Sequence, residues 1–149
     1  MASVVVGIDG TEASRQALRW AAEEAKLRGA ALRVVHTWDR PYAVSGPYPQ
    51  TSGPRVDEED TERGLAEELL DRELAATGVE ATGVRIEREL VEGPPAKTLI
   101  DAAQHADLLV IGSDRRGRLA HEPLGRVGRE CVQHAPCPVV IVRPTPSGN

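Results

Sequence analysis

The chain has 149 residues, 40% hydrophobic and 28% charged, a balance typical of a globular protein with a buried core. We predict one domain over residues 1–149, ending in a short tail at 145–149. A formal net charge of −5 and a pI near 5.4 provide no basic field, which argues against nucleic acid and membrane-surface partners. No apolar run approaches the roughly 20 residues of a membrane span. Gly7 and Asp9 interrupt the apolar start too soon for a signal peptide, so we expect a cytoplasmic protein.

Five short apolar stretches have the composition of β-strands. Val4, Val5 and Val6 form a β-branched run that a turn ends at once, as expected of a strand buried in a parallel sheet. Residues 84–91 instead alternate apolar and charged side chains, which indicates one solvated face and a place near a sheet edge. The predicted strands cover residues 3–8, 32–37, 84–91, 108–111 and 139–142.

Apolar residues at helical spacing predict four helices between these strands. Thr11 is a suitable N-cap and Gly29 a suitable C-cap for the first helix, and the second ends near Gly78. Pro94 and Pro95 open the third helix, where proline costs no hydrogen bond. The predicted apolar faces lie within residues 13–25, 65–74, 96–103 and 124–131.

The alternation of strands and helices predicts an α/β fold, an open five-stranded parallel sheet with helices on both faces, because parallel strands need crossovers. Residues 39–57 are rich in Pro, Gly and Ser, and are predicted to form a long, flexible surface loop. Such a loop is either mobile decoration or a lid over a binding site.

The cysteines and histidines offer little chemistry. Cys131 and Cys137 are predicted to be reduced, buried thiols, and the intervening His134 supplies too few ligands, at unusual spacing, for a zinc site. We predict no metal site. The four histidines form no nucleophile-and-base pattern, so dedicated catalysis has little support beyond a slow hydrolysis, for which Asp9 is the only acid we nominate.

Two loops are candidates for a ligand site, because open α/β sheets bind ligands at the carboxyl ends of strands where the strand order reverses. Asp9 and Gly10 follow the first strand, and residues 112–126 follow the fourth and enter a helix whose N-terminus suits an anion. The second loop is not a P-loop, because Arg118 and Leu119 stand where Lys and Ser or Thr are needed. The first loop does not complete a dinucleotide-binding glycine motif.

Residues 4–14 (VVVGIDGTEAS) and 134–142 (HAPCPVVIV) together resemble the universal stress protein family, and the resemblance spans nearly the whole chain. It implies the strand order 3-2-1-4-5, which places the alternating third strand at an edge. It also implies a homodimer that pairs through the last strand, with an interface at Val139, Val140, Ile141 and Val142. That strand is a short, uncharged run, and exposed edges invite pairing.

The nucleotide-binding branch of this family carries Gly, two residues, Gly, nine residues, Gly, then Ser or Thr. Gly112 and Gly125 match the first and third glycines, but Arg115 and Arg126 replace the second glycine and the hydroxyl residue. Asp9 matches the acid at the adenosine end of the site. The implied cofactor is ATP or another adenine nucleotide, with Mg²⁺ if it accompanies the phosphates. The predicted nucleotide-binding residues are Asp9, Gly10, Thr37, Gly112, Ser113, Arg115, Gly117, Gly125 and Arg126.

Two functions remain open at this point. The first is a dimeric stress-response module whose ATP site is weakened by Arg115, which blocks close backbone approach, and by Arg126, which removes a hydroxyl. The same arginines carry charge that can bind phosphates through side chains. The second is a nucleotide-free dimer that uses residues 112–126 to contact a protein partner. A nucleotide-dependent change in melting temperature separates the two.

Overall fold

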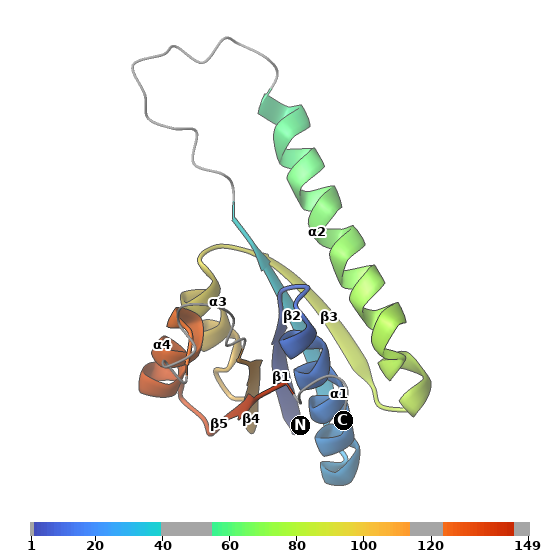
Figure 1. Ribbon diagram of the computed structural model, residues 1–149, viewed down its shortest axis with the longest axis vertical. Helices are drawn as coiled ribbons and strands as arrows, with labels where there is room; N and C mark the ends of the chain where they lie inside the picture. The colour runs from blue at the N-terminus through green and yellow to red at the C-terminus, as the bar shows by residue number, and fades with distance from the viewer. Residues whose placement is uncertain (1, 40–54, 114–123, 145–149) are drawn as a thin grey trace.

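The computed structural model describes residues 2–39, 55–113 and 124–144. Strands and helices alternate along the chain, as the apolar patterns predict, and one short 3-10 helix, η1, is additional (Figure 1). In chain order the elements are β1 (Ser3–Ile8), α1 (Glu12–Arg28), β2 (Ala31–Trp38), α2 (Arg55–Thr77), η1 (Val79–Thr82), β3 (Ile86–Glu92), α3 (Pro95–Ala102), β4 (Leu108–Gly112), α4 (Arg126–His134) and β5 (Val139–Val142).

The five strands form one parallel sheet in the order β3-β2-β1-β4-β5. This confirms the predicted α/β class, the strand order and the place of β3 at an edge. β5 lies at the opposite edge and pairs with β4 from Leu109↔Val139 to Gly112↔Val142. The order of the strands reverses between β1 and β4, so the two loops that follow these strands diverge from neighbouring positions.

Helices cover both faces of the sheet, with α1 and α2 on one side and α3 and α4 on the other (Figure 1). The first face carries the larger apolar cluster, in which the small alanines of α1 allow close packing on β1 and β4. Thr11 caps α1 as predicted, since its side chain accepts a hydrogen bond from the N–H of Ser14, and Gly29 ends the helix in the left-handed conformation.

Helix α2 is held to α1 by an ion pair that no sequence pattern indicated. Arg15 Nε donates to Glu73 Oε1 and Oε2 at 3.0 and 3.1 Å, and Arg15 Nη2 donates to Oε2 at 2.9 Å. The Glu73 side chain is 1% exposed, so this fork supplies the charge partner that a buried carboxylate needs. The hydrogen bonds to Glu73 raise the pKa of Arg15 above its ordinary value.

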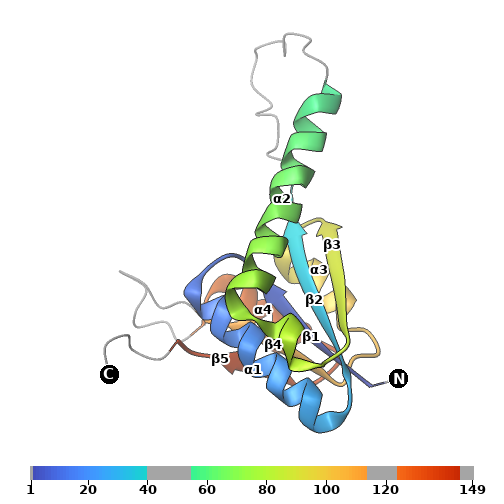
Figure 2. The ribbon, with the colours of Figure 1, turned by 90° about the vertical axis from the view of Figure 1, so that its right-hand side faces the viewer.

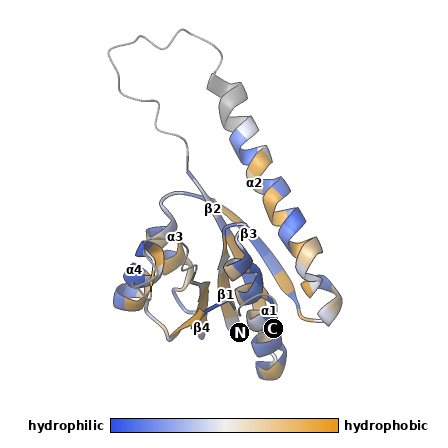
Figure 3. Ribbon diagram, viewed as in Figure 1, coloured by the Kyte–Doolittle hydropathy of each residue, from blue (hydrophilic) through white to orange (hydrophobic). Residues whose placement is uncertain are grey.

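The amino-terminal part of α2 extends beyond the end of the sheet (Figure 2). Apolar and polar segments alternate along its length (Figure 3). Leu70 and Leu74 are buried in the α1 cluster, whereas Leu65 remains 54% exposed. The apolar stripe of α2 thus meets the sheet in its carboxyl-terminal half, while its earlier part has less to pack against.

Two boundaries differ from prediction by more than one residue. Helix α2 begins at Arg55, inside the predicted loop 39–57, and the rest of that loop from residue 40 lies outside the described residues, as does the predicted tail 145–149. Strand β3 begins at Ile86 rather than at residue 84, because Gly83 and η1 turn the chain after α2. No helix among the described residues is long and apolar enough to span a membrane.

Candidate functional site

A cavity of about 360 Å³ opens at the carboxyl ends of β1, β2 and β4, between the sheet and helices α3 and α4. Its position is the point where the strand order reverses, where the two candidate loops were expected to meet. Most of its wall is apolar, with a few polar groups at the strand ends. The described lining residues are Gly7, Ile8, Asp9, Ser14, Val35, Thr37, Pro95, Leu99, Ile111, Gly112, Ser113, Leu124, Gly125, Arg126, Val127, Gly128 and Ile141.

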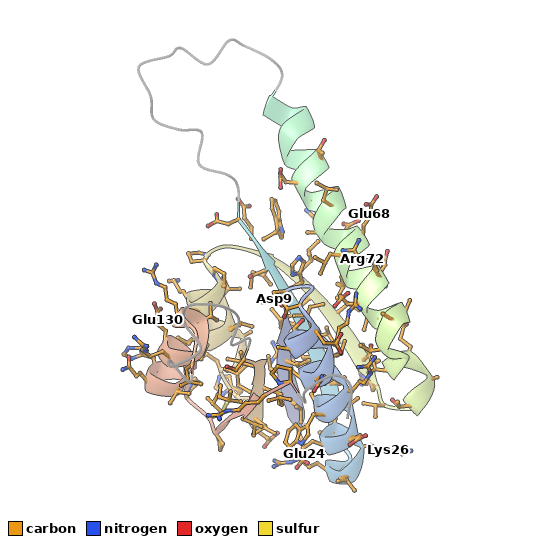
Figure 4. All side chains as sticks on the ribbon, viewed as in Figure 1. Asp9, Glu24, Lys26, Glu68, Arg72 and Glu130 are labelled. Atoms are coloured by element: carbon orange, nitrogen blue, oxygen red, sulfur yellow. The ribbon has the colours of Figure 1, made fainter. Side chains whose placement is uncertain are left out.

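The turn between β1 and α1 carries Asp9 to the mouth of the cavity (Figure 4). Asp9 Oδ1 accepts hydrogen bonds from Thr11 N at 3.0 Å and from Thr11 Oγ1 at 2.6 Å. Gly10 stands at φ +85°, a conformation that side chains rarely adopt, and it lies against Leu69 of α2 rather than on the cavity wall. Asp9 is therefore an exposed carboxylate on a well-braced turn.

Gly112, at the end of β4, is required by the packing of α1. A Cβ atom at this position would lie 2.4 Å from the carbonyl oxygen of Ala13 and 2.8 Å from the nitrogen of Ser14. The strand end is thus pressed against the first turn of α1. The first glycine of the resemblance motif consequently has a structural function, independent of any ligand.

Gly125, before α4, has the opposite character. Its φ is −72°, and among the described residues a Cβ there would have nothing within 4 Å and no side-chain hydrogen bond caps the helix. Neither sterics nor backbone conformation demands glycine here. The N–H groups of the first turn lie at the cavity wall, where an anion can accept their hydrogen bonds.

The side chain of Arg126 is directed to solvent. It is 93% exposed, and its Nε lies 3.6 Å from Oε1 of Glu130, which is one turn further along α4. Glu130 is labelled in Figure 4. Arg126 thus contributes to the cavity wall mainly through its position at the start of α4. In this arrangement the guanidinium of Arg126 lies beside Glu130, not at a phosphate position in the cavity.

The structure brings six of the predicted nucleotide-binding residues to one cavity. Asp9 and Thr37 stand at the ends of β1 and β2, Gly112 and Ser113 at the end of β4, and Gly125 and Arg126 at the start of α4. The predicted residues Arg115 and Gly117 lie outside the described residues.

The apolar walls of the cavity carry no sequence signal of a site. Leu99 lies on the apolar stripe of α3, Leu124 comes just before α4, and Ser14 lies in the first turn of α1. The proline at the start of α3, Pro95, also lines the cavity. In the sequence these residues look like ordinary buried positions. Only the cavity between α3, α4 and the sheet shows that they line a site.

The two thiols on this face are poor nucleophiles. Cys131 is buried in the same cluster as Leu99 and Ile111, and burial raises its pKa to about 11. Burial also raises the pKa of Cys137, which is half-buried rather than buried as predicted. Both are free cysteines and remain protonated at neutral pH.

A family model described as the universal stress protein family matches residues 1–143. The chain belongs to the universal stress protein family. A universal stress protein of Mycobacterium tuberculosis is 35% identical over 141 residues, which cover 93% of this chain and 47% of the relative. The chain therefore spans about half the length of the curated relatives it matches.

Solved universal stress protein structures share the fold. UspA from Lactobacillus plantarum is 23% identical with a TM-score of 0.75, over 95% of this chain and 97% of that one. A universal stress protein in complex with cAMP is 25% identical with a TM-score of 0.62, over 97% and 98% of the two chains. An Arabidopsis thaliana family protein with AMP bound is 20% identical with a TM-score of 0.66, over 99% and 97%.

Proposed function

We propose that this universal stress protein domain is a stress-response module that binds an adenine nucleotide in the cavity beside β1 and β4. The observation that carries the proposal is the cavity itself. An exposed carboxylate, Asp9, and the N-terminus of α4, which no described side chain caps, both line this cavity at the switch point of the sheet. Two structural relatives hold cAMP and AMP, which supports the same class of ligand here.

The chemistry of the cavity suits the three parts of a nucleotide. Leu99, Val35 and Ile111 supply apolar surface for a base. A carboxylate accepts hydrogen bonds from hydroxyl groups, so Asp9 is assigned to the ribose. The backbone N–H groups that follow Gly125 are donors for a phosphate, and the dipole of α4 favours its charge.

The motif differences limit how many phosphates are held. Arg126 replaces a hydroxyl donor, and its own side chain is turned toward Glu130. Asp9 is the only carboxylate among the described lining residues, so a magnesium ion would arrive on the phosphates of the ligand rather than on a cluster of acids. We therefore expect AMP, with fewer phosphates to place, to bind at least as well as ATP.

Calorimetric titration of AMP, ADP, ATP and cAMP, with and without magnesium, tests this function. Asp9→Asn should weaken AMP binding roughly tenfold, since a hydrogen bond to a charged group is lost. Asp39→Asn removes another exposed carboxylate outside the cavity and should leave Kd unchanged. If neither the wild type nor the Arg115→Gly/Arg126→Ser revertant binds any of the four, the nucleotide function is wrong and the nucleotide-free interaction module replaces it.

We further propose that the domain forms a homodimer through β5, in a cytoplasmic setting that suits its acidic charge and free thiols. Leu109 N donates to Pro138 O at 3.0 Å and Ser113 N donates to Val142 O at 2.9 Å, so these carbonyls face β4. Because backbone groups alternate along a strand, the N–H and C=O of Val139 and Ile141 face outward. Among the described strands none pairs with that side.

Two substitutions at one position test the dimer. Val139→Pro removes an outward N–H and leaves the bonds to β4 intact, so light scattering should report a monomer. Val139→Ala keeps the N–H with a shorter side chain and should remain dimeric. A wild-type protein of monomeric mass at micromolar concentration would count against pairing through β5.

A further inference from the structure

We propose that Thr11 is a positioning residue, which holds the Asp9 carboxylate so that Oδ2 is the acceptor offered to a ribose hydroxyl. This inference rests on the proposed nucleotide site and assigns a residue that does not itself line the cavity. Thr11 would thereby contribute to discrimination between ribose and deoxyribose ligands.

The two carboxylate oxygens of Asp9 differ in their hydrogen bonding. Oδ1 receives both the backbone N–H of Thr11 at 3.0 Å and the Thr11 hydroxyl at 2.6 Å. These two bonds occupy the acceptor capacity of Oδ1. In the described part of the chain no side chain or backbone group bonds to Oδ2, although Asp9 borders the cavity. The carboxylate therefore presents one oxygen to a ligand and anchors the other.

The backbone of the turn is braced as well. Ser14 Oγ accepts a hydrogen bond from Asp9 N at 3.2 Å and donates one to Thr11 O at 3.1 Å. Gly10, which lies between Asp9 and Thr11 in the chain, packs against Leu69 of α2. An exposed aspartate would otherwise lose rotamer freedom when a ligand bound, so a carboxylate that is already fixed binds at a smaller entropic cost.

Helix capping alone does not account for the Thr11 hydroxyl. A cap needs an acceptor, and Thr11 Oγ1 fulfils that need by accepting from Ser14 N at 3.1 Å. The single hydroxyl hydrogen takes no part in the cap, and it is directed to Asp9 Oδ1. The hydroxyl of Thr11 thus has two functions, capping α1 and holding Asp9. They can be separated by testing whether a substitution at Thr11 still changes ligand binding when Asp9 is absent.

A double-mutant cycle makes that separation. Kd is measured by calorimetry for AMP and for its 2′-deoxy and 3′-deoxy analogues, with the wild type, Thr11→Val, Asp9→Asn and the double variant. Thr11→Val should weaken AMP roughly tenfold and bring the AMP-to-deoxy ratio of Kd values toward one, as expected when a hydrogen bond to a charged group is lost. In the Asp9→Asn background the same substitution should change Kd less than about twofold. Thr11→Ser keeps both hydrogen bonds and should restore the wild-type values.

The ratio of Kd values protects the test from a loss of folding, because a smaller folded fraction affects all three ligands equally. Equal effects of Thr11→Val with Asp9 and with Asn at position 9 would overturn the positioning function, even if nucleotide binding is sound. An unchanged AMP-to-deoxy ratio in Thr11→Val would also overturn it. Failure of the wild type to bind AMP is a different result, because it overturns the nucleotide site together with the inference.

Discussion

The two faces of the sheet are packed to different degrees. On the α1 and α2 face, large side chains such as Leu18, Leu32 and Leu74 are fully buried in one continuous cluster. On the α3 and α4 face the buried cluster is smaller, the covering helices are shorter, and a cavity of about 360 Å³ remains beside β1 and β4. The first face therefore stabilises the fold, and the second has space for a ligand.

The largest effect is expected at Gly112, where the two faces meet at the end of β4. Gly112→Ala places a Cβ atom 2.4 Å from a backbone oxygen of α1, so either the strand or the helix must move. We expect a loss of at least about 3 kcal/mol in the free energy of unfolding, because backbone overlap cannot be relieved by a rotamer change. Urea unfolding measures it.

Gly125→Ala is the matched control, since the same methyl group is added where no described residue lies within 4 Å. It should cost less than about 1 kcal/mol, the scale of a poorer N-cap residue. Equal losses at the two glycines would refute the distinction between a structural glycine and an open one.

A pair of leucine truncations compares the faces directly. Leu18→Ala, in the filled cluster, should lower the free energy of unfolding by about 3 kcal/mol, whereas Leu99→Ala, beside the cavity, should lower it by about 2 kcal/mol. The difference is expected because Leu99 already borders empty space and loses fewer contacts. Urea unfolding curves give both free-energy losses from the shift in midpoint, provided that the variants and the wild type share the same m-value. A greater loss for Leu99→Ala would mean that the cavity face is the better packed one.

A smaller change is expected at the cap of α1. Thr11→Ala removes the acceptor for Ser14 N and should cost about 1 kcal/mol of stability. Thr11→Ser keeps that acceptor, so its thermal unfolding should match the wild type closely. If Thr11→Ala unfolded like the wild type, the cap would add nothing to the filled face.

The smallest effect at neutral pH is expected from Cys131, whose pKa is raised from its ordinary 9.0 to about 11 by burial. Between these values the unfolded thiol ionises while the folded thiol keeps its proton, so raising the pH favours unfolding. The contribution is complete below pH 9 and is lost as the pH rises toward about 11. The stability difference between the wild type and Cys131→Ala, measured across this range, should fall with pH. A constant difference would contradict the burial effect.

Much of the candidate site could be predicted from sequence because it lies where strands end. Asp9, Gly112 and Gly125 were identified from turn residues and from a resemblance motif, and the structure brings them to one cavity. The same motif could not tell that Gly112 serves the packing of α1 whereas Gly125 stands in open space. Both are single glycines in the sequence, and their difference depends on atoms contributed by another element.

Other features had no sequence signal. Glu73 looks like one of many acidic residues on α2, and only the approach of α1 shows that it is buried against Arg15. The i,i+4 spacing of Arg126 and Glu130 does allow an ion pair on a helix, but only the structure shows that the Arg126 side chain is 93% exposed. The early start of α2 at Arg55 was missed because Pro, Gly and Ser just before it favoured a loop.

The sequence by itself determined the order and type of the elements, since apolar periodicity and caps such as Thr11 and Gly29 act over a few neighbouring residues. It also indicated that β3 lies at an edge, which the strand order confirms. The face predicted to be solvated is instead half-buried at Glu87 and Glu89, because Arg33 of β2 pairs with Glu89. Only the tertiary structure decided that α3 and α4 leave a cavity at the switch point, and that Asp9 borders this cavity together with residues of β2, β4 and α4. Those properties depend on distances between elements far apart in the chain, which local patterns do not encode.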